Sequence, residues 1–233
     1  MILAVKDLSA GYGQTPVLRK MTLSLGVGEI LGVVGHNGMG KTTLLRALMG
    51  ILAAAGGSIV FSGDEIASLP AHRRSNLGIG YVAQGERRFP GLTVAENLKL
   101  ASLVPARTKP MSVAEAIELF PQIAGLMDRP SSVLSGGERQ LLAIVRACVR
   151  APRLLLLDEL TEGVQPSRVD EIADRLRYLH KRNGTSMMIV DQELPFVASL
   201  ATRVLVMQKG EVVREIRPDD LSDPHVLGGF DGN

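Results

Sequence analysis

The sequence predicts an α/β fold in which helices cover both faces of a parallel sheet. Short apolar stretches of strand length alternate with helical patterns along much of the 233-residue chain. Four such stretches lie at residues 30–34, 80–83, 154–157 and 186–190. Continuous apolar runs are typical of parallel strands, which are buried on both faces. We therefore expect a single domain over residues 1–233.

Antiparallel β structure is expected on either side of this core. Residues 1–30 alternate as short strands with a turn at residues 10–13, and residues 57–64 have the pattern of another hairpin arm. Residues 204–215 read as a late hairpin about a Lys209-Gly210 turn. Glycine clusters between alternating apolar residues favour such turns. We interpret the N-terminal part as an antiparallel β edge subdomain.

Helical patterns occupy residues 42–49, 137–150 and 166–181. The segment 91–133 differs from the rest, because its helical spacing is interrupted by prolines at 105, 110, 121 and 130. Proline interrupts a helix by removing a donor and clashing with the preceding turn. We therefore expect an inserted helical subdomain at 91–133, within a core formed by 1–90 and 134–233.

Composition excludes several classes of site. Aromatic residues make up 3% of the chain and tryptophan is absent, which argues against stacking platforms for single-stranded nucleic acid. The net charge is only +2, and we expect no nucleic-acid partner. Cys148 is the only cysteine, so an intrachain disulfide is impossible, and the four histidines lack metal-ligand spacing. No signal peptide or membrane-spanning apolar run is apparent.

The segment Gly35-His-Asn-Gly-Met-Gly-Lys-Thr42 matches the phosphate-binding pattern GxxxxGK[ST]. Glycines let the backbone curl so that successive N–H groups point at an anion, and the following helix adds the positive end of its dipole. Lys41 then reaches the β- and γ-phosphates, and the Thr42 hydroxyl can ligate Mg²⁺. The alternative is a glycine-rich strand–helix turn without a ligand. We expect ATP and Mg²⁺ as cofactors.

A second piece of this site is the strand Leu154-Leu-Leu-Leu-Asp158-Glu159. It delivers two carboxylates to its C-terminal end, where ligands bind in α/β sheets. Asp158 suits the Mg²⁺ shell and Glu159 suits polarising the attacking water. On its own, the pattern could equally be an ordinary strand end.

The third piece is Leu134-Ser135-Gly136-Gly137-Glu138, directly before a predicted helix. Free N–H groups, a hydroxyl donor and the helix dipole make a second anion site there. The alternative is a simple helix cap, because serine and glycine are favoured at that position. Its place between the phosphate loop and the acidic strand favours the anion site.

Together with Gln84 and Glu162-Gly-Val-Gln-Pro166, these motifs resemble the ATPase subunit of ABC transporters, over residues 3–216. The resemblance implies a P-loop NTPase core, an ATP hydrolase activity and a site shared between two chains. It implies that Tyr12 stacks on adenine, that Gln84 contacts Mg²⁺ and relays the nucleotide state, and that the Ser135 segment binds the γ-phosphate held by the other chain. The loop at 162–166 would cross the dimer interface.

The site residues implied in this way fall into three groups. Catalytic roles go to Glu159, Lys41, Gln84 and Gln192, and metal-binding roles to Thr42, Gln84 and Asp158. The nucleotide-binding set is Tyr12, Gly35, Asn37, Gly38, Gly40, Lys41, Thr42, Thr43, Ser135, Gly136 and Gly137.

Two positions depart from the family pattern. Leu160 follows the acidic pair where the family usually has proline, which can alter the turn but removes no catalytic group. Gln192 occupies the place of the family's switch histidine. An amide can hydrogen-bond a γ-phosphate oxygen but carries no proton charge. We expect glutamine to be tolerated there, since the members that the chain most resembles commonly have it.

The wording of Gly35–Leu45, Phe89–Asn97 and Thr161–Ser167 resembles the hydrophobic amino acid uptake branch. That branch contains importers of branched-chain amino acids and of urea or short amides. Gln84 and Glu162–Ser167 resemble the urea and amide members more, although the general architecture fits either. It implies a second ATPase, identical or a sister subunit, two membrane permease subunits and an extracytoplasmic substrate-binding protein. The chain would then lie at the cytoplasmic face of the inner membrane, contacting the permease near Gln84–Leu98, with Phe89 and Leu92 at the edge.

Two rival functions remain to be weighed. One is an ABC ATPase not coupled to a membrane, as in chromosome-organising proteins, although residues 85–134 leave no room for long coiled-coil arms. The other is a nucleotide-binding regulatory module with little turnover, which Gln192 makes conceivable. Intact Lys41, Asp158 and Glu159 argue against it.

Overall fold

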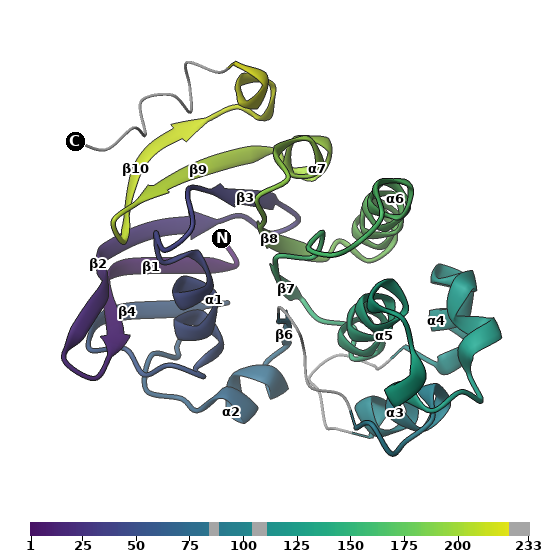
Figure 1. Cartoon of the computed structure of the whole chain (residues 1–233). Helices are drawn as coiled ribbons and strands as arrows, with labels where there is room; N and C mark the ends of the chain where they lie inside the picture. Colours follow the sequence, from purple (N-terminus) through teal and green to yellow (C-terminus); the bar gives the residue numbers. More distant parts are fainter. Residues whose placement is uncertain (84–88, 104–110, 224–233) are drawn as a thin grey trace.

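A computed structural model describes residues 1–83, 89–103 and 111–223 of the chain. Its centre is a six-stranded sheet in the order β10-β9-β3-β8-β7-β6, in which β10 alone is antiparallel to its neighbour (Figure 1). The strands are β3 (Ile30–Val34), β6 (Ile79–Val82), β7 (Leu154–Asp158), β8 (Ser186–Val190), β9 (Arg203–Gln208) and β10 (Glu211–Ile216). The expected parallel sheet is thereby confirmed.

The antiparallel edge sheet has the order β2-β1-β4-β5. Its strands are β1 (Leu3–Tyr12), β2 (Thr15–Leu25), β4 (Gly56–Phe61) and β5 (Asp64–Glu65). The turn expected at residues 10–13 lies further along the chain, at residues 13–14, because the strand continues to Tyr12, which pairs with Thr15 across the turn. Register shifts along β1 keep the long strand paired, since bulges absorb residues that would otherwise break the ladder.

Seven α-helices are described: α1 (Lys41–Met49), α2 (Ala71–Asn76), α3 (Val94–Ser102), α4 (Val113–Leu119), α5 (Gly136–Val149), α6 (Pro166–Asn183) and α7 (Leu194–Leu200). Helices α3, α4 and α5 each begin with a capping box, in which a serine or threonine side chain and a glutamate three residues later exchange hydrogen bonds with the backbone. Helices α2 and α7 were not predicted, because they are too short to show a helical period in the sequence.

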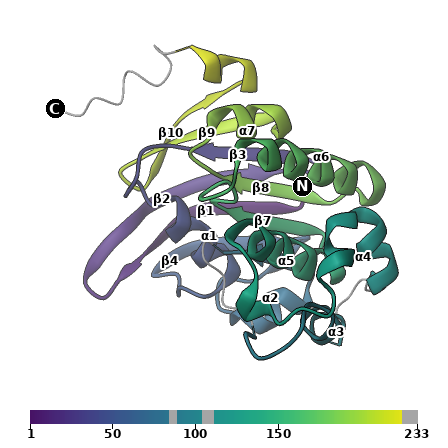
Figure 2. The ribbon, with the colours of Figure 1, turned by 45° about the vertical axis from the view of Figure 1, so that its right-hand side comes forward.

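Two hydrophobic clusters cover the two faces of the parallel sheet. Along β7, Leu154 and Leu156 belong to the cluster that includes α1 and the antiparallel sheet. Leu155 and Leu157 belong to the other cluster, with α3 to α7. This alternation follows from the two-residue period of a strand. Figure 2 shows α3, α4 and α5 grouped together on one side, away from the strands β1, β2 and β4.

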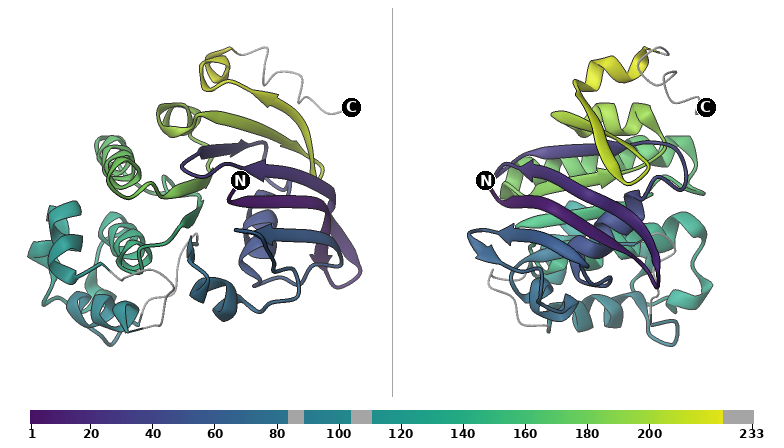
Figure 3. Two further views of the ribbon diagram at one scale, coloured as in Figure 1. Left: turned by 180° about the vertical axis from the view of Figure 1, so that it is seen from behind. Right: turned by 90° about the vertical axis from the view of Figure 1, so that its left-hand side faces the viewer.

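The two sheets meet at the turn between β9 and β10. Lys209 and Gly210 both have positive φ, 49° and 84°, as a two-residue hairpin of this kind requires. The Arg19 amide donates to the Gly210 carbonyl at 3.1 Å, and a Cβ on Gly210 would lie 1.8 Å from the Val17 carbonyl oxygen. Glycine is thus required for β2 to approach this turn. The left view of Figure 3 shows the purple hairpin running beside the yellow-green strands, with the teal helices on the opposite side of the molecule.

Helix α2 holds the end of α1 through a buried arginine. The Arg74 guanidinium, 1% exposed, donates to the carbonyls of Ala47 and Leu48 at 2.8 Å each. These are among the carbonyls that a helix leaves without internal partners at its C-terminus. Within the described residues, none of the helices has the length and apolarity to span a membrane.

Candidate functional site

The phosphate loop joins β3 to α1 and depends on glycine for its shape. Gly35, Gly38 and Gly40 have φ values of 151°, 81° and 99°. A Cβ on Gly35 would lie 2.4 Å from the Met207 carbonyl oxygen, so glycine is needed there for space as well as conformation. Asn37 lies exposed in the loop, whereas Thr43 is buried in α1. The loop therefore presents its backbone at the N-terminal end of α1.

Lys41 closes this loop from within. Its ammonium donates to the carbonyls of Gly35 at 2.6 Å and His36 at 3.1 Å, and the residue is 5% exposed. Burial lowers the pKa of Lys41, while the carboxylates of Glu159 and Asp158 oppose that shift. A positive charge thus lies between the loop and the acidic end of β7. Within the described residues, the ammonium donates its hydrogen bonds to backbone carbonyls and none to a carboxylate.

The carboxylate of Asp158 is fully buried and held on both oxygens. Thr42 donates to Oδ1 at 2.9 Å and Tyr81 donates to Oδ2 at 2.8 Å. Burial raises the pKa of Asp158, and the hydrogen bonds from Tyr81 and Thr42 act against that rise. Burial, together with the neighbouring Asp158, raises the pKa of Tyr81, so its hydroxyl stays protonated and donates. Tyr81 was not among the residues expected from sequence.

These oxygens fit Mg²⁺. The Thr42 hydroxyl and the Asp158 carboxylate converge from the start of α1 and the end of β7, and both are hard oxygen ligands. The described part of the chain contains no group of three or more acidic, histidine or cysteine side chains that could hold a metal ion. A nucleotide-bound Mg²⁺ needs none, because phosphate oxygens and water complete its octahedral shell.

Glu159 and Gln192 are brought together from the ends of neighbouring strands. The Gln192 amide donates to the Glu159 carboxylate at 3.1 Å, although the two residues are 33 positions apart. Glu159 itself has a positive φ of 49°, and its amide donates to the Val190 carbonyl at 2.8 Å. Leu160, which replaces the usual proline, is fully buried in the helix-covered cluster.

A second link joins the same two strand ends. The buried Asp191 carboxylate accepts from the Thr161 hydroxyl at 2.5 Å and from the Thr161 amide at 3.1 Å. It also accepts from the backbone amides of Gln192 at 2.8 Å and Glu193 at 3.1 Å. Asp191 thereby fixes the backbone that carries Gln192. The sequence shows an aspartate directly after a predicted strand, but it does not indicate which groups Asp191 contacts.

Tyr12 lies at the end of β1 and is 46% exposed. Its hydroxyl accepts a hydrogen bond from the Arg46 guanidinium at 3.2 Å. Arg46 lies one turn beyond Thr42 on α1, so α1 carries contacts to both the loop and the exposed ring. Gln84 falls outside the described residues.

The Ser135 segment forms the start of α5, a helix that packs in the same hydrophobic cluster as Leu155 and Leu157. The Ser135 side chain caps the helix, and the Glu138 carboxylate accepts a hydrogen bond from the Ser135 amide at 2.7 Å. Arg129 forms an ion pair with Glu138 at 2.9 Å. The hydrogen bonds from Ser135 lower the pKa of Glu138. A Cβ on Gly136 or Gly137 would meet nothing closer than 3.5 Å, and neither has a positive φ. The fold of this chain therefore does not require glycine at either position.

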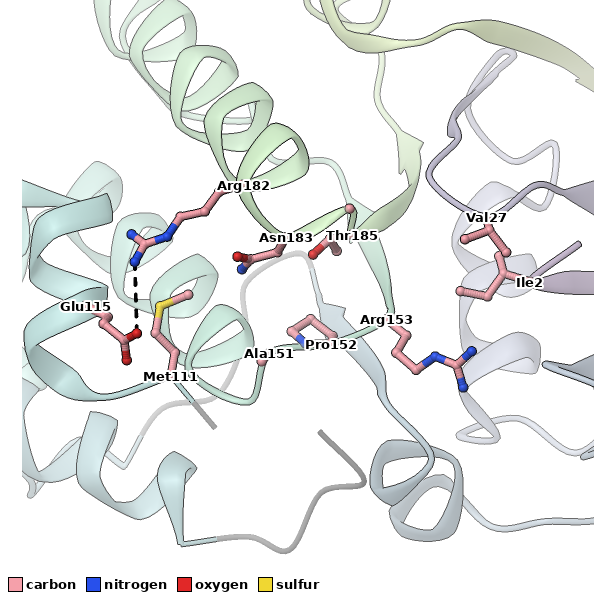
Figure 4. Close-up of a pocket in the computed structure, with 11 residues that line it drawn as sticks. Ile2, Val27, Met111, Glu115, Ala151, Pro152, Arg153, Arg182, Asn183 and Thr185 are labelled. Atoms are coloured by element: carbon pink, nitrogen blue, oxygen red, sulfur yellow. Dashed lines mark ion pairs between the residues drawn. The ribbon is translucent and has the colours of Figure 1, made fainter. Parts of the chain in front are cut away.

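A cavity of about 430 Å³ lies elsewhere, at the opposite ends of the strands. Figure 4 shows Arg153 just before β7, Thr185 just before β8, and Arg182 facing Glu115, 3.9 Å away. The candidate residues Lys41, Asp158, Glu159 and Gln192 instead lie at or beyond the carboxyl ends of β3, β7 and β8. This cavity is consequently separate from the candidate site.

Comparisons with known proteins agree with this geometry. The profile of the family described as ABC transporter matches residues 18–162. LivF of Archaeoglobus fulgidus, by name a branched-chain amino acid transport ATP-binding protein, is 35% identical over 213 residues, covering 91% of this chain and 90% of its own. BraG of Pseudomonas aeruginosa, a high-affinity branched-chain amino acid transport ATP-binding protein, is 34% identical over 91% of both chains.

Other relatives carry different names. The lipopolysaccharide export ATP-binding protein LptB of Escherichia coli is 32% identical over 96% of this chain and 94% of its own. Among solved structures, a nucleotide-free ATP-binding cassette from an ABC transporter has a TM-score of 0.86 at 24% identity, covering 100% of this chain and 99% of that one. The chain therefore belongs to the ABC transporter family, as an ATP-binding subunit that hydrolyses ATP.

Proposed function

We propose that the chain works as one half of a dimer in which each ATP is bound between the phosphate loop of one chain and the Ser135 segment of the other. The observation that carries this is the pair of glycines at the start of α5. Gly136 and Gly137 have room for a side chain and ordinary backbone angles, so the fold does not explain them. Close approach of an external anion to a helix N-terminus does explain them.

The phosphate loop is arranged to receive the triphosphate. Lys41 now donates to the carbonyls of Gly35 and His36, and it exchanges these partners for β- and γ-phosphate oxygens when ATP binds. The backbone N–H groups of the loop and the start of α1 supply the remaining positive potential. Tyr12 stacks on the adenine, at the exposed end of β1.

Thr42 and Asp158 would hold Mg²⁺, directly or through water, with Gln84 as a further ligand. When bound, the ion neutralises charge that develops on the β- and γ-phosphates. The Thr42 hydroxyl and the Asp158 carboxylate lie 2.9 Å apart, which supports their acting on one ion.

Glu159 polarises the water that attacks the γ-phosphate in line. The amide of Gln192 orients this carboxylate through the 3.1 Å hydrogen bond, and Asp191 fixes the backbone of Gln192. Gln192 performs this orientation without a proton charge, which is how glutamine serves at the switch position. Loss of the γ-phosphate removes the bridge between the two chains, and the dimer opens.

The opening and closing would drive a transporter that imports branched-chain amino acids. This assignment follows the names of LivF and BraG, and a urea or short-amide importer is the alternative. Two permease subunits would bind near residues 84–98, where Phe89 is 47% exposed with the Arg146 guanidinium 5.6 Å from its ring. The chain would then lie at the cytoplasmic face of the membrane, beneath an extracytoplasmic binding protein.

The first experiment compares ATP hydrolysis by the wild type and Glu159→Gln, with light scattering to follow dimer formation. We expect turnover by the wild type, a loss of at least about 100-fold in the variant, and stable ATP-dependent dimers of the variant. Glu193→Gln, the same carboxylate-to-amide change at an exposed neighbour, is the matched control. A Glu159→Gln chain that remains monomeric at saturating ATP contradicts the shared site.

The transported compound is tested separately. A strain lacking this chain should lose uptake of radiolabelled leucine and recover it with the wild type but not with Glu159→Gln. Retained leucine uptake together with lost urea or acetamide uptake would select the alternative substrate class.

A further inference from the structure

Tyr81 makes a contact that the proposed mechanism does not use. It comes from β6, and its hydroxyl donates a hydrogen bond to the Asp158 carboxylate at the end of β7, 2.8 Å away. We propose that Tyr81 is a positioning residue for Asp158, so that metal binding depends on the Tyr81 hydroxyl. This inference rests on the proposed role of Asp158.

The first step concerns the orientation of the Asp158 carboxylate. A carboxylate held by one donor can rotate about its terminal bond, which is a soft torsion. Here Thr42 holds Oδ1 from α1 at 2.9 Å while Tyr81 holds Oδ2 from β6 at 2.8 Å. Donors on two separate elements fix the plane of the group, so that one oxygen faces the phosphate loop.

The second step concerns why Tyr81 is held in place. Strand β6 pairs in parallel with β7, with Tyr81 opposite Leu156, two residues before Asp158 on the same face. The ring packs at the edge of the cluster that contains α1. The position of the Tyr81 hydroxyl is therefore set by the strand register.

The competing explanation is that Tyr81 only fills space between β6 and α1. Tyr81→Phe separates the two explanations, because it keeps the ring and removes the hydroxyl. Tyr178→Phe, at a residue 47% exposed on α6, is the matched control for loss of a hydroxyl.

The measurement is the affinity for a fluorescent ATP analogue, in Mg²⁺ and in EDTA. For Tyr81→Phe we expect an unchanged Kd in EDTA and a Mg²⁺-dependent tightening that is about 3- to 10-fold smaller than in the wild type. This is less than a hydrogen bond to a charged group contributes in full, because the metal-free state shares part of it. The half-saturating Mn²⁺ concentration, read by electron paramagnetic resonance on the ATP complex, should rise by the same factor.

An unchanged Mg²⁺ effect in Tyr81→Phe, or an equal loss in Mg²⁺ and in EDTA, overturns the positioning role. A wild type that binds no nucleotide would instead refute the proposed function itself.

Discussion

The hydrogen bond between Gln192 and Glu159 leads to a quantitative prediction about turnover. Gln192→Ala removes the one side-chain hydrogen bond that the Glu159 carboxylate accepts within the described residues, at 3.1 Å. It leaves the backbone bonds from Gln192 and Glu193 to Asp191 in place, so the strand end keeps its shape. The change should therefore act on the orientation of Glu159 alone.

The size of the effect follows from the exposure of the pair. Both partners reach solvent, and a hydrogen bond in such a setting contributes about 0.5–1.5 kcal/mol. At 1.36 kcal/mol for each factor of ten, kcat should fall about 2- to 12-fold. The KM for ATP should stay within about twofold, because neither side chain belongs to the phosphate loop.

Steady-state ATP hydrolysis at saturating Mg²⁺ measures both constants. Glu193→Ala, a truncation at the adjacent exposed position, is the control and should leave kcat unchanged. A loss beyond about 100-fold in Gln192→Ala would refute the reasoning, since one solvent-exposed hydrogen bond to the carboxylate cannot account for it. Unchanged kcat would equally show that Glu159 needs no support from Gln192.

Three further predictions follow from single groups. Lys41→Ala should abolish ATP binding in isothermal titration calorimetry with an unchanged melting temperature, because Lys41 is the cation inside the loop; unchanged affinity would contradict the loop's role. For Glu29, burial acts against ionisation, but hydrogen bonds from Arg203 and Gly26 outweigh it and lower the pKa below 4.5. The folded chain therefore loses stability as the pH falls through this lowered pKa, and urea unfolding of Glu29→Gln should show a weaker acid dependence. Burial raises the pKa of the Cys148 thiol to about 12, so a disulfide reagent at pH 8 should react only after unfolding, and rapid reaction of the folded chain would oppose this.

The local features of the site could be read from the sequence because they depend on short-range rules. Three glycines with positive φ in one loop, a lysine at its end and an apolar run ending in two carboxylates each reflect conformation or burial over a few residues. The capping box at Ser135 likewise follows from a serine and a glutamate three positions apart. The α/β class followed from the spacing of the apolar strands.

Elements without a local signature could not be read in the same way. Helix α2 has six residues and carries Arg74, which donates hydrogen bonds to carbonyls of α1 some 26 residues earlier in the chain. Helix α7 begins with Leu194-Pro195, and proline in the first turn is a helix start signal. The helix is too short for a helical period to support that signal. In both cases tertiary contacts, not helical period, stabilise the helix.

The sequence by itself determined the class of the fold, the phosphate loop and the identity of the acidic pair. The tertiary structure alone decided which side chains meet there: Tyr81 and Thr42 on Asp158, Gln192 on Glu159, and Arg46 on Tyr12. The physical reason is that glycine conformations and apolar periods are properties of neighbouring residues. Contacts between strand ends depend instead on the order and register of parallel strands, which bring residues far apart in the chain to one edge of the sheet.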